Sequence, residues 1–387
     1  MSIRILSVDD EQDMEALIRM NFRRQIRKGI FDFVFAHSAQ EALNMLSEVA
    51  EIGVVLSDIN MPEMDGLTML EKIKKLDRTD LKVLMVSAYG DMDNLRAAMN
   101  RGAFDFVTKP ISFEDLELTL NKTIEHVAQQ RSMLDEHDHL VAIQQDLSVA
   151  RELQQSILPK IFPPFPDRSD FDIYAIMDAA KSVGGDFYDF FLVDPTHIGV
   201  VIADVSGKGI PAAIFMAICR TLMRANAVNQ FSTNECVIRT NTLLSQENVN
   251  TMFVTLFYGI LDTVSGELIY TNAGHNPPFI ITPDGQVTPL SIKGGIALGV
   301  FEDFVFQSHT TQLKPNDTLF LYTDGVTEAM NATDDQYTEQ RLAIELGKLG
   351  MELPKTITER IVRTVKEHAA GVEQSDDITA LTLKYFG

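Results

Sequence analysis

The stretch VVLSDINMPEMDG, residues 54–66, passes from a β-branched apolar run into an acidic turn that ends at Gly66. Such a run, bounded by turn residues, is typical of a buried strand. Four more runs of this kind occur nearby, and the predicted strands are Ile3–Val8, Phe31–Ala36, Val54–Ser57, Val83–Ser87 and Phe104–Thr108. The segments between them have helical spacing. This alternation predicts an α/β domain with a five-stranded, doubly wound parallel sheet.

Reactive side chains stand where four of these strands end, namely Asp9, Asp10, Asp58, Ser87 and Lys109. In a doubly wound sheet these ends meet at one edge. Three carboxylates there would repel one another unless a cation holds them, and oxygen ligands favour Mg²⁺. A lysine and a hydroxyl beside them suit phosphoryl oxygens. The pattern predicts attack by an aspartate on a phosphoryl group, whereas acids that merely solvate loops would not recur on four strands.

The same segment resembles the receiver domain of bacterial two-component response regulators, over about the first third of the chain. The matching stretches are VDDE (Val8–Glu11), SDINMPEMDG (Ser57–Gly66), VSA (Val86–Ala88) and Lys109-Pro110. The resemblance implies that Asp58 is the phosphoacceptor and that a histidine kinase or another phosphodonor supplies the phosphoryl group.

The resemblance also implies a role for each neighbour of Asp58. The implied Mg²⁺ ligands are Asp9, Asp10, Asp58 and the backbone carbonyl of Asn60. Ser87 and Lys109 would contact the phosphoryl group. Phe106 stands where the family carries its switch aromatic, commonly Tyr, so a hydroxyl-dependent part of the switch is absent.

The segment from Leu116 to Leu158 contains no Gly or Pro and predicts one long helix that ends before Pro159. An a/d heptad fits Leu140, Ile143, Leu147, Ala150 and Ile157, and Gln154 breaks it. A dimeric coiled coil is the leading interpretation, and packing on the flanking domains is the alternative. The predicted domains are residues 1–122, a helical linker over 123–158, and residues 159–387.

Residues 170–387 alternate hairpin-like strand pairs with helical patterns, which predicts an α+β domain. Four Asp-bearing motifs occur in it: VGGDFYDFF (Val183–Phe191), IADVSGKGIPAA (Ile202–Ala213), LYTDGVTEA (Leu321–Ala329) and SDDITALTL (Ser375–Leu383). Any one of them could be an ordinary turn. Four together suit two divalent ions about 4 Å apart, and the absence of His/Cys spacing favours Mg²⁺ or Mn²⁺ over zinc.

These motifs resemble the bacterial PP2C-like phosphatases of the SpoIIE/RsbU type over residues 155–387. The resemblance implies two antiparallel sheets packed together and flanked by helices, and metal-dependent dephosphorylation of phosphoserine or phosphothreonine. The implied metal ligands and catalytic residues are Asp186, Asp204, Asp324 and Asp377, with the Val205 carbonyl assisting. Asp377 is preferred to Asp376 because it directly precedes Ile378-Thr379. His275, in NAGHNPP, is the best-placed general acid, although a structural role is favoured.

Joined together, the two resemblances imply a response regulator whose phosphatase output is controlled at Asp58. The implied substrate is a phosphorylated anti-sigma factor antagonist, a small STAS-domain protein, and the linker helix implies a homodimer. The alternative is a non-catalytic adaptor of a sigma-factor pathway. Some relatives that have lost their metal aspartates work in that way, but this sequence retains all four.

The net charge of −22 disfavours nucleic acid and anionic lipid as partners. The two cysteines, Cys219 and Cys236, are expected to be free thiols in a reducing compartment. The N-terminus lacks the pattern of a signal peptide. The longest apolar run, Ile210–Cys219, is about half the ~20 residues that span a membrane. We therefore expect a cytoplasmic protein.

Overall fold

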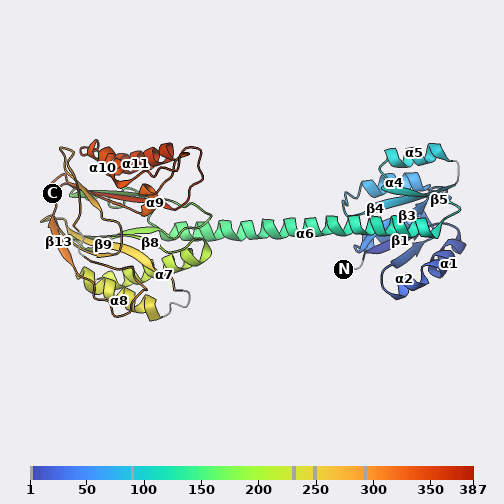
Figure 1. Cartoon of the computed structure of the whole chain (residues 1–387), viewed down its shortest axis with the longest axis horizontal. Coiled ribbons are helices and arrows are strands. Elements are labelled where there is room, and N and C mark those ends of the chain that lie inside the picture. The colour runs from blue at the N-terminus through green and yellow to red at the C-terminus, as the bar shows by residue number, and fades with distance from the viewer. Residues whose placement is uncertain (1–2, 89–90, 229–231, 247–250, 292–293) are drawn as a thin grey trace. The chain divides into compact units, whose positions relative to one another are not determined.

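The computed structural model describes residues 3–88, 91–228, 232–246, 251–291 and 294–387. The chain divides into two compact units, Met1–Ile143 and Gln144–Gly387, which are called here the N-terminal and C-terminal units (Figure 1). Each unit is described by itself.

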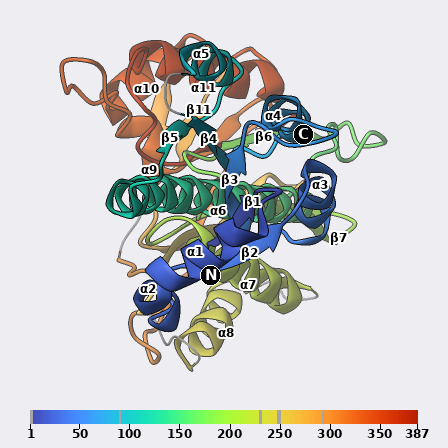
Figure 2. The same ribbon diagram turned by 90° about the vertical axis from the view of Figure 1, so that its right-hand side faces the viewer.

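The N-terminal unit is built on one parallel sheet. Its strands are β1 (Arg4–Val8), β2 (Asp32–Ala36), β3 (Ile52–Asp58), β4 (Lys82–Ala88) and β5 (Asp105–Lys109), in the order β2-β1-β3-β4-β5 (Figure 2). All neighbouring strands are parallel. Strand β3 is buried along its whole length, as expected for a strand covered on both faces. The predicted doubly wound parallel sheet is confirmed.

Helices cover both faces of this sheet and enclose a separate apolar core on each. They are α1 (Gln12–Asn21), α2 (Arg23–Arg27), α3 (Ala39–Glu48), α4 (Gly66–Lys74), α5 (Met92–Asn100) and the start of α6. One core contains residues of α3, α4 and α5, and the other contains residues of α1 and α6. Helix α4 begins directly after the acidic turn, because the Asp65 carboxylate accepts the N–H of Thr68. The cap fixes the end of the acidic turn where α4 begins.

Helix α6 (Phe113–Ile157) is a single helix, as its sequence predicts. Leu116, Leu120 and Val127 are buried in the core of the N-terminal unit. Residues 132–146 are exposed in the single chain, including the heptad position Leu140. The dimeric coiled coil therefore stays a prediction. Gln154 is buried, which gives a reason for the interrupted heptad.

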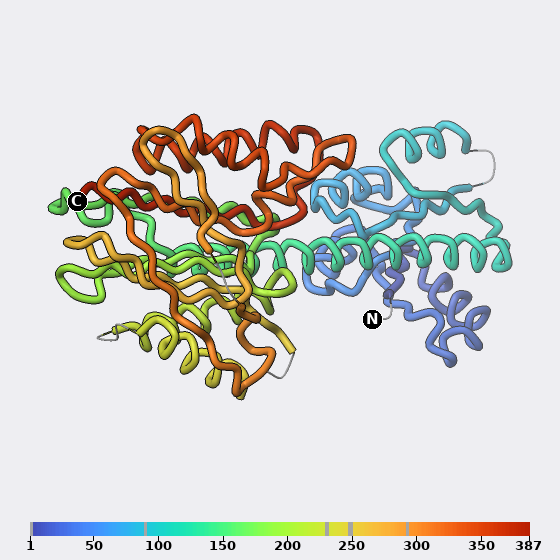
Figure 3. Tube along the Cα trace, turned by 60° about the vertical axis from the view of Figure 1, so that its left-hand side comes forward, coloured from blue at the N-terminus to red at the C-terminus, as the bar shows by residue number. Residues whose placement is uncertain are grey.

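The C-terminal unit contains two five-stranded sheets, and every strand pair in them is antiparallel. The first has the order β13 (His309–Gln312), β10 (Glu267–Ala273), β9 (Val254–Asp262), β8 (His197–Val205) and β7 (Phe187–Asp194). The second has the order β12 (Val287–Pro289), β11 (Phe279–Ile281), β14 (Thr318–Tyr322), β15 (Ile378–Tyr385) and β6 (Phe171–Asp178). Figure 3 traces the chain through both sheets.

The two sheets pack face to face around one large apolar core, to which β8 and β9 contribute from one sheet and β15 from the other. The helices α7 (Ile210–Ala227) and α8 (Thr233–Gln246) lie outside one sheet, and α10 (Glu339–Gly347) and α11 (Pro354–His368) lie outside the other (Figure 1). A short helix, α9 (Asp324–Thr327), follows β14. The predicted layering of packed antiparallel sheets flanked by helices is confirmed.

Both cysteines are buried and free, Cys219 in α7 and Cys236 in α8. No helix within the described ranges is long and apolar enough to span a bilayer.

Candidate functional site

The predicted acidic cluster of the N-terminal unit forms at one edge of its sheet. Asp9, Asp10 and Asp58 each offer a carboxylate oxygen, and these oxygens all lie within 4.8 Å of one another. The parallel register explains their approach, because Val8 of β1 pairs with Ser57 of β3. Among the described residues this is the one trio of His, Cys, Asp or Glu groups that meets this distance.

A lysine from β5 reaches into this trio. The Nζ atom of Lys109 lies 2.7 Å from Oδ2 of Asp58 and 3.3 Å from Oδ2 of Asp9. Burial would lower the pKa of Lys109, but its hydrogen bond to Asp58 and the charges of both aspartates raise it. Burial raises the pKa of Asp9, and the charge of Asp58 adds to that rise. The chain itself thus supplies one countercharge to the cluster.

The remaining predicted residues surround this cluster. Ser87 is fully buried at the end of β4, and its hydroxyl has no hydrogen-bond partner within the described structure. Such an orphaned donor suits a phosphoryl oxygen. Asn60 lies two residues beyond β3. Phe106 is 41% exposed on β5, so its ring faces solvent in this conformation. The Lys109-Pro110 peptide bond is cis.

The aspartates of the C-terminal unit gather at one end of its two sheets. Asp186 directly precedes β7 and Asp204 lies in β8; the register of these strands pairs Phe187 with Ala203. Asp324 follows β14, and Asp377 precedes β15, its antiparallel neighbour. The Thr323 hydroxyl bridges the sheets by donating to Oδ2 of Asp186 at 2.8 Å. Both sheets therefore contribute to one site.

Burial and mutual repulsion raise the pKa values of three of these acids. Burial, followed by the charges of Asp204 and Asp377, raises the pKa of Asp186 well above its usual range. Burial and the charge of Asp324 raise the pKa of Asp204. Burial, Glu328 and Asp376 raise that of Asp324. Like charges held in a buried site favour bound cations.

Asp376 and Asp377 differ in what occupies their oxygens. Asp377 accepts three backbone N–H groups, from Ala180 (2.9 Å), Gly185 (2.7 Å) and Asp186 (3.4 Å). Oδ2 of Asp376 contacts only the Lys208 ammonium among described side chains, at 3.0 Å. Asp376 also acts electrostatically on both Asp204 and Asp324. This geometry favours Asp376 as the candidate ligand, whereas the sequence analysis weighed both acids and preferred Asp377 for its place directly before Ile378.

The donor set fits hard divalent cations. Its side chains supply carboxylate oxygens, the ligands that Mg²⁺ and Mn²⁺ prefer. Val205 is buried, and a side chain at Gly185 would place its Cβ 2.8 Å from the Val205 carbonyl oxygen. Glycine at 185 therefore keeps this carbonyl free to face the site.

His275 has a structural role. It is buried, its Nδ1 accepts from the Thr255 hydroxyl at 2.9 Å, and its Nε2 donates to the Tyr322 carbonyl at 3.1 Å. Burial lowers its pKa to about 4. With both nitrogens engaged and the ring neutral, His275 joins the two sheets and is unsuited to general acid work.

Asp189 also positions the site. It is buried on β7 and forms ion pairs with Arg220 (3.0 Å) and Arg224 (3.3 Å) of α7. These pairs hold α7, which begins six residues after Asp204, against the sheet that carries Asp186.

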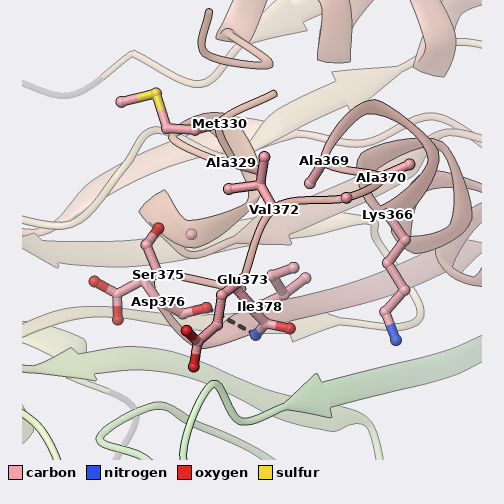
Figure 4. Close-up of a pocket in the computed structure, with 13 residues that line it drawn as sticks. Ala329, Met330, Lys366, Ala369, Ala370, Val372, Glu373, Ser375, Asp376 and Ile378 are labelled. Carbon is pink, nitrogen blue, oxygen red and sulfur yellow. Dashed lines mark hydrogen bonds between the residues drawn. The ribbon is translucent and has the colours of Figure 1, made fainter. Parts of the chain in front are cut away.

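A pocket of about 250 Å³ opens beside the acidic site. Figure 4 shows Ser375 and Asp376 at its floor, with Ala329, Ala369 and Val372 around it. The pocket therefore combines acidic groups at Asp376 and Glu373 with an apolar side at Ala329 and Val372 and a basic group at Lys366.

Comparisons with known proteins agree with both units. Residues 5–121 match the family described as response regulator receiver domain, and residues 194–386 match stage II sporulation protein E (SpoIIE). The chain is similar to protein IcfG of Synechocystis sp., with 31% identity over 62% of this chain and 41% of that protein. It is also similar to phosphoserine phosphatase RsbU of Bacillus subtilis, with 29% identity over 70% of this chain and 80% of RsbU.

The solved SiaA-PP2C domain of Pseudomonas aeruginosa shares the fold of the C-terminal unit. It superposes with a TM-score of 0.57 at 20% identity, over 64% of this chain and 98% of that domain. The chain thus combines a domain of the receiver family with a SpoIIE-type domain that has the PP2C fold.

Proposed function

We propose that this chain is a response regulator whose output is metal-dependent dephosphorylation of phosphoserine or phosphothreonine on a partner protein. The observation that carries the proposal is the convergence of Asp186, Asp204, Asp324 and Asp376 from two sheets, with raised pKa values for the first three. The likeness to RsbU, which is named a phosphoserine phosphatase, supports this chemistry.

Two Mn²⁺ or Mg²⁺ ions would be held by these aspartates with the Val205 carbonyl, and Asp377 would fix the loop that carries Asp186. When bound, the ions would lower the pKa of a water so that it can act as hydroxide toward phosphorus at neutral pH, and would stabilise charge on the phosphoryl oxygens. The Thr323 hydroxyl, 2.8 Å from Oδ2 of Asp186, orients that carboxylate. The neighbouring pocket of about 250 Å³ would take the residues that flank the phosphorylated side chain.

The receiver unit would provide the input. A carboxylate oxygen of Asp58 would form a bond to phosphorus as the bond between phosphorus and the donor atom of a histidine kinase or another phosphodonor breaks, with its electron pair staying on the donor. Mg²⁺ at Asp9, Asp10, Asp58 and the Asn60 carbonyl would neutralise the transferred group, and Ser87 and Lys109 would contact its oxygens. Phosphorylation adds about −1.5 to −2 of charge at this edge. Lys109 must then reorganise, because its amine already lies 2.7 Å from Asp58.

The substrate that we propose is a phosphorylated STAS-type anti-sigma factor antagonist in the cytoplasm, and the active form is a homodimer joined through α6. Within it, residues 1–122, 123–158 and 159–387 would act as receiver, linker and phosphatase. Sedimentation tests the dimer: the full chain should sediment as a dimer, whereas a receiver truncated after Arg131, which keeps Leu116, Leu120 and Val127 in its core, should sediment as a monomer.

Hydrolysis of p-nitrophenyl phosphate, with and without Mn²⁺, tests the catalytic proposal. The wild-type protein should hydrolyse it only with metal, and Asp204→Asn should be inactive. Equal, metal-independent rates in the two proteins would favour the second candidate, a non-catalytic adaptor that binds sigma-pathway proteins. Incubation with candidate phosphorylated antagonists, with and without beryllofluoride, would then identify the substrate and the sign of control.

A further inference from the structure

The last turns of α6 contain one buried polar side chain. Gln154 is 6% exposed, whereas Leu153 beside it is 62% exposed and Gln155 is exposed as well. A polar side chain directed inward, beside an apolar one directed outward, reverses the usual pattern of a helix. Gln154 therefore requires partners that its neighbours do not.

Gln154 finds two partners in one residue, the backbone carbonyl and the backbone N–H of Gly184. The Gln154 Nε2 donates to the Gly184 carbonyl at 2.6 Å, and the Gly184 N–H donates to the Gln154 Oε1 at 3.1 Å. The two hydrogen bonds are buried and reciprocal, and they join residues 30 positions apart. Because the amide of glutamine has one donor side and one acceptor side, few other side chains can make the same pair.

Gly184 begins the loop that carries the candidate ligand Asp186. The loop is held on its other side by Asp377, which accepts the N–H groups of Gly185 and Asp186. A side chain at Gly184 would place its Cβ 2.1 Å from Oδ2 of Asp377, so only glycine fits between the two clamps. Gln154 from the helix and Asp377 from the strand edge together fix this loop.

We propose that Gln154 is a positioning residue through which the end of α6 sets the geometry of the 184–186 loop, and thereby the affinity of the site for divalent cations. This inference rests on the proposed metal-dependent function. Asp186 is buried and repelled by Asp204 and Asp377, so its loop must be held in place for its carboxylate to face a cation. A rotation or shift of α6 would break both hydrogen bonds together.

The proposal gives the helix a direct route to the metal site. The helices α7 and α8 lie outside the sheet that carries Asp204. The contacts of Gln154 bypass both helices and reach the ligand-bearing loop in one step. Loss of groups that orient metal ligands typically costs about 10- to 100-fold in metal affinity.

The test is Mn²⁺ binding by isothermal titration calorimetry on the full chain. All variants carry Asp10→Asn as the background, because this change removes a carboxylate from the acidic trio of the N-terminal unit. The heat of Mn²⁺ binding should then arise from the C-terminal unit. Gln154→Met keeps the volume and removes both hydrogen bonds, and Gln155→Met is the matched control on the exposed side of the same turn. We expect Gln154→Met to weaken Mn²⁺ binding by about 10- to 100-fold, and Gln155→Met to stay within about twofold of the background.

A second readout separates positioning from general damage. With positioning, saturating Mn²⁺ restores kcat of Gln154→Met to near the wild-type value, while the half-saturating Mn²⁺ concentration rises. If Gln154→Met fails to fold, Gln154→Ala decides, because it removes both hydrogen bonds without burying a charge or a bulkier group and keeps high helix propensity; its Mn²⁺ affinity should also fall about 10- to 100-fold. Mn²⁺ affinity equal to that of the background in the folded Gln154 variant overturns the proposal. Tight Mn²⁺ binding without hydrolysis in the wild-type protein would instead overturn the proposed function alone.

Discussion

The chain builds two acidic sites from the same residue type but neutralises them differently. In the receiver unit, three aspartates lie within 4.8 Å of one another, and Lys109 is 2.7 Å from the central one. In the C-terminal unit, five aspartates come from the ends of two sheets, and burial and mutual repulsion raise the pKa values of three of them. Their one ion-paired cation among the described residues is Lys208, on the more exposed Asp376.

The difference indicates different tasks. A site with its own ammonium group can exist without metal and respond when phosphoryl charge arrives. A buried site of like charges is completed only by external cations, and this suits hydrolysis that depends on metal. The two sites thus differ in where a lysine lies: Lys109 contacts the central acid of its trio, whereas Lys208 contacts only Asp376.

The largest effect should come from exchanging the tandem acids. Asp376→Asn removes the charge of a proposed ligand and should lower Mn²⁺-dependent hydrolysis by about 10³-fold, equivalent to about 4 kcal/mol of barrier. Its metal-free unfolding free energy should change little. Asp377→Asn keeps one oxygen for the N–H groups of Gly185 and Asp186 but turns an amide donor toward the N–H of Ala180, and should lower that unfolding free energy by about 2 kcal/mol. Urea unfolding and Mn²⁺ titration of both variants decide; the reverse pattern would restore Asp377 as the ligand and Asp376 as the structural acid.

Insertions in α6 test whether the two sites communicate through it. Two residues added after Asp138 rotate the downstream helix by about 200°. Seven added residues rotate it by almost two full turns, so the helix returns to within about 20° of its original orientation. The shorter insertion should abolish the response of hydrolysis to beryllofluoride, an effect of about fivefold or more. The longer one should preserve it. An intact response in the two-residue variant would show that coupling does not depend on the rotational phase of α6.

Removing the ammonium groups should strengthen metal binding at both sites, but unequally. Lys109→Met should raise Mg²⁺ affinity of the receiver by about three- to tenfold, because a partly buried cation no longer repels the ion. Lys208→Met should have a smaller effect on Mn²⁺ binding, since its side chain is more exposed. Calorimetric titrations measure both. Weaker Mg²⁺ binding by Lys109→Met would mean that the lysine organises the trio instead of competing with the ion.

A further predicted change concerns pH and His275. Its pKa in the folded chain is about 4, below the unfolded value of about 6.5. The unfolded state therefore binds the proton first, so the stability that neutral His275 contributes is complete above about pH 6.5 and is lost as the pH falls toward 4. By pH 5 this amounts to about 2 kcal/mol. His275→Gln should flatten this part of the stability curve relative to the wild type; parallel curves would contradict the buried, neutral role.

Much of the fold could be predicted because its signals are local. The β-branched runs around Val54 and the Gly- and Pro-free segment that became α6 each determine an element from neighbouring residues. The two acidic sites followed from motifs at strand ends. By contrast, Gln154 looked like a break in a heptad, because its partner Gly184 lies 30 residues away across a proline-rich break. The different roles of Asp376 and Asp377 likewise could not be read from the sequence, because the backbone N–H groups that bind Asp377 lie almost 200 residues upstream.

The most direct test of the account is phosphate release from a phosphoserine peptide by the full chain, with Mn²⁺ or with excess chelator, for the wild type and Asp204→Asn. The account predicts release by the wild-type protein with Mn²⁺, and none with chelator or from the variant. Release that persists with chelator, or that is equal in Asp204→Asn, would contradict a metal-dependent phosphatase built on the aspartates of the C-terminal unit.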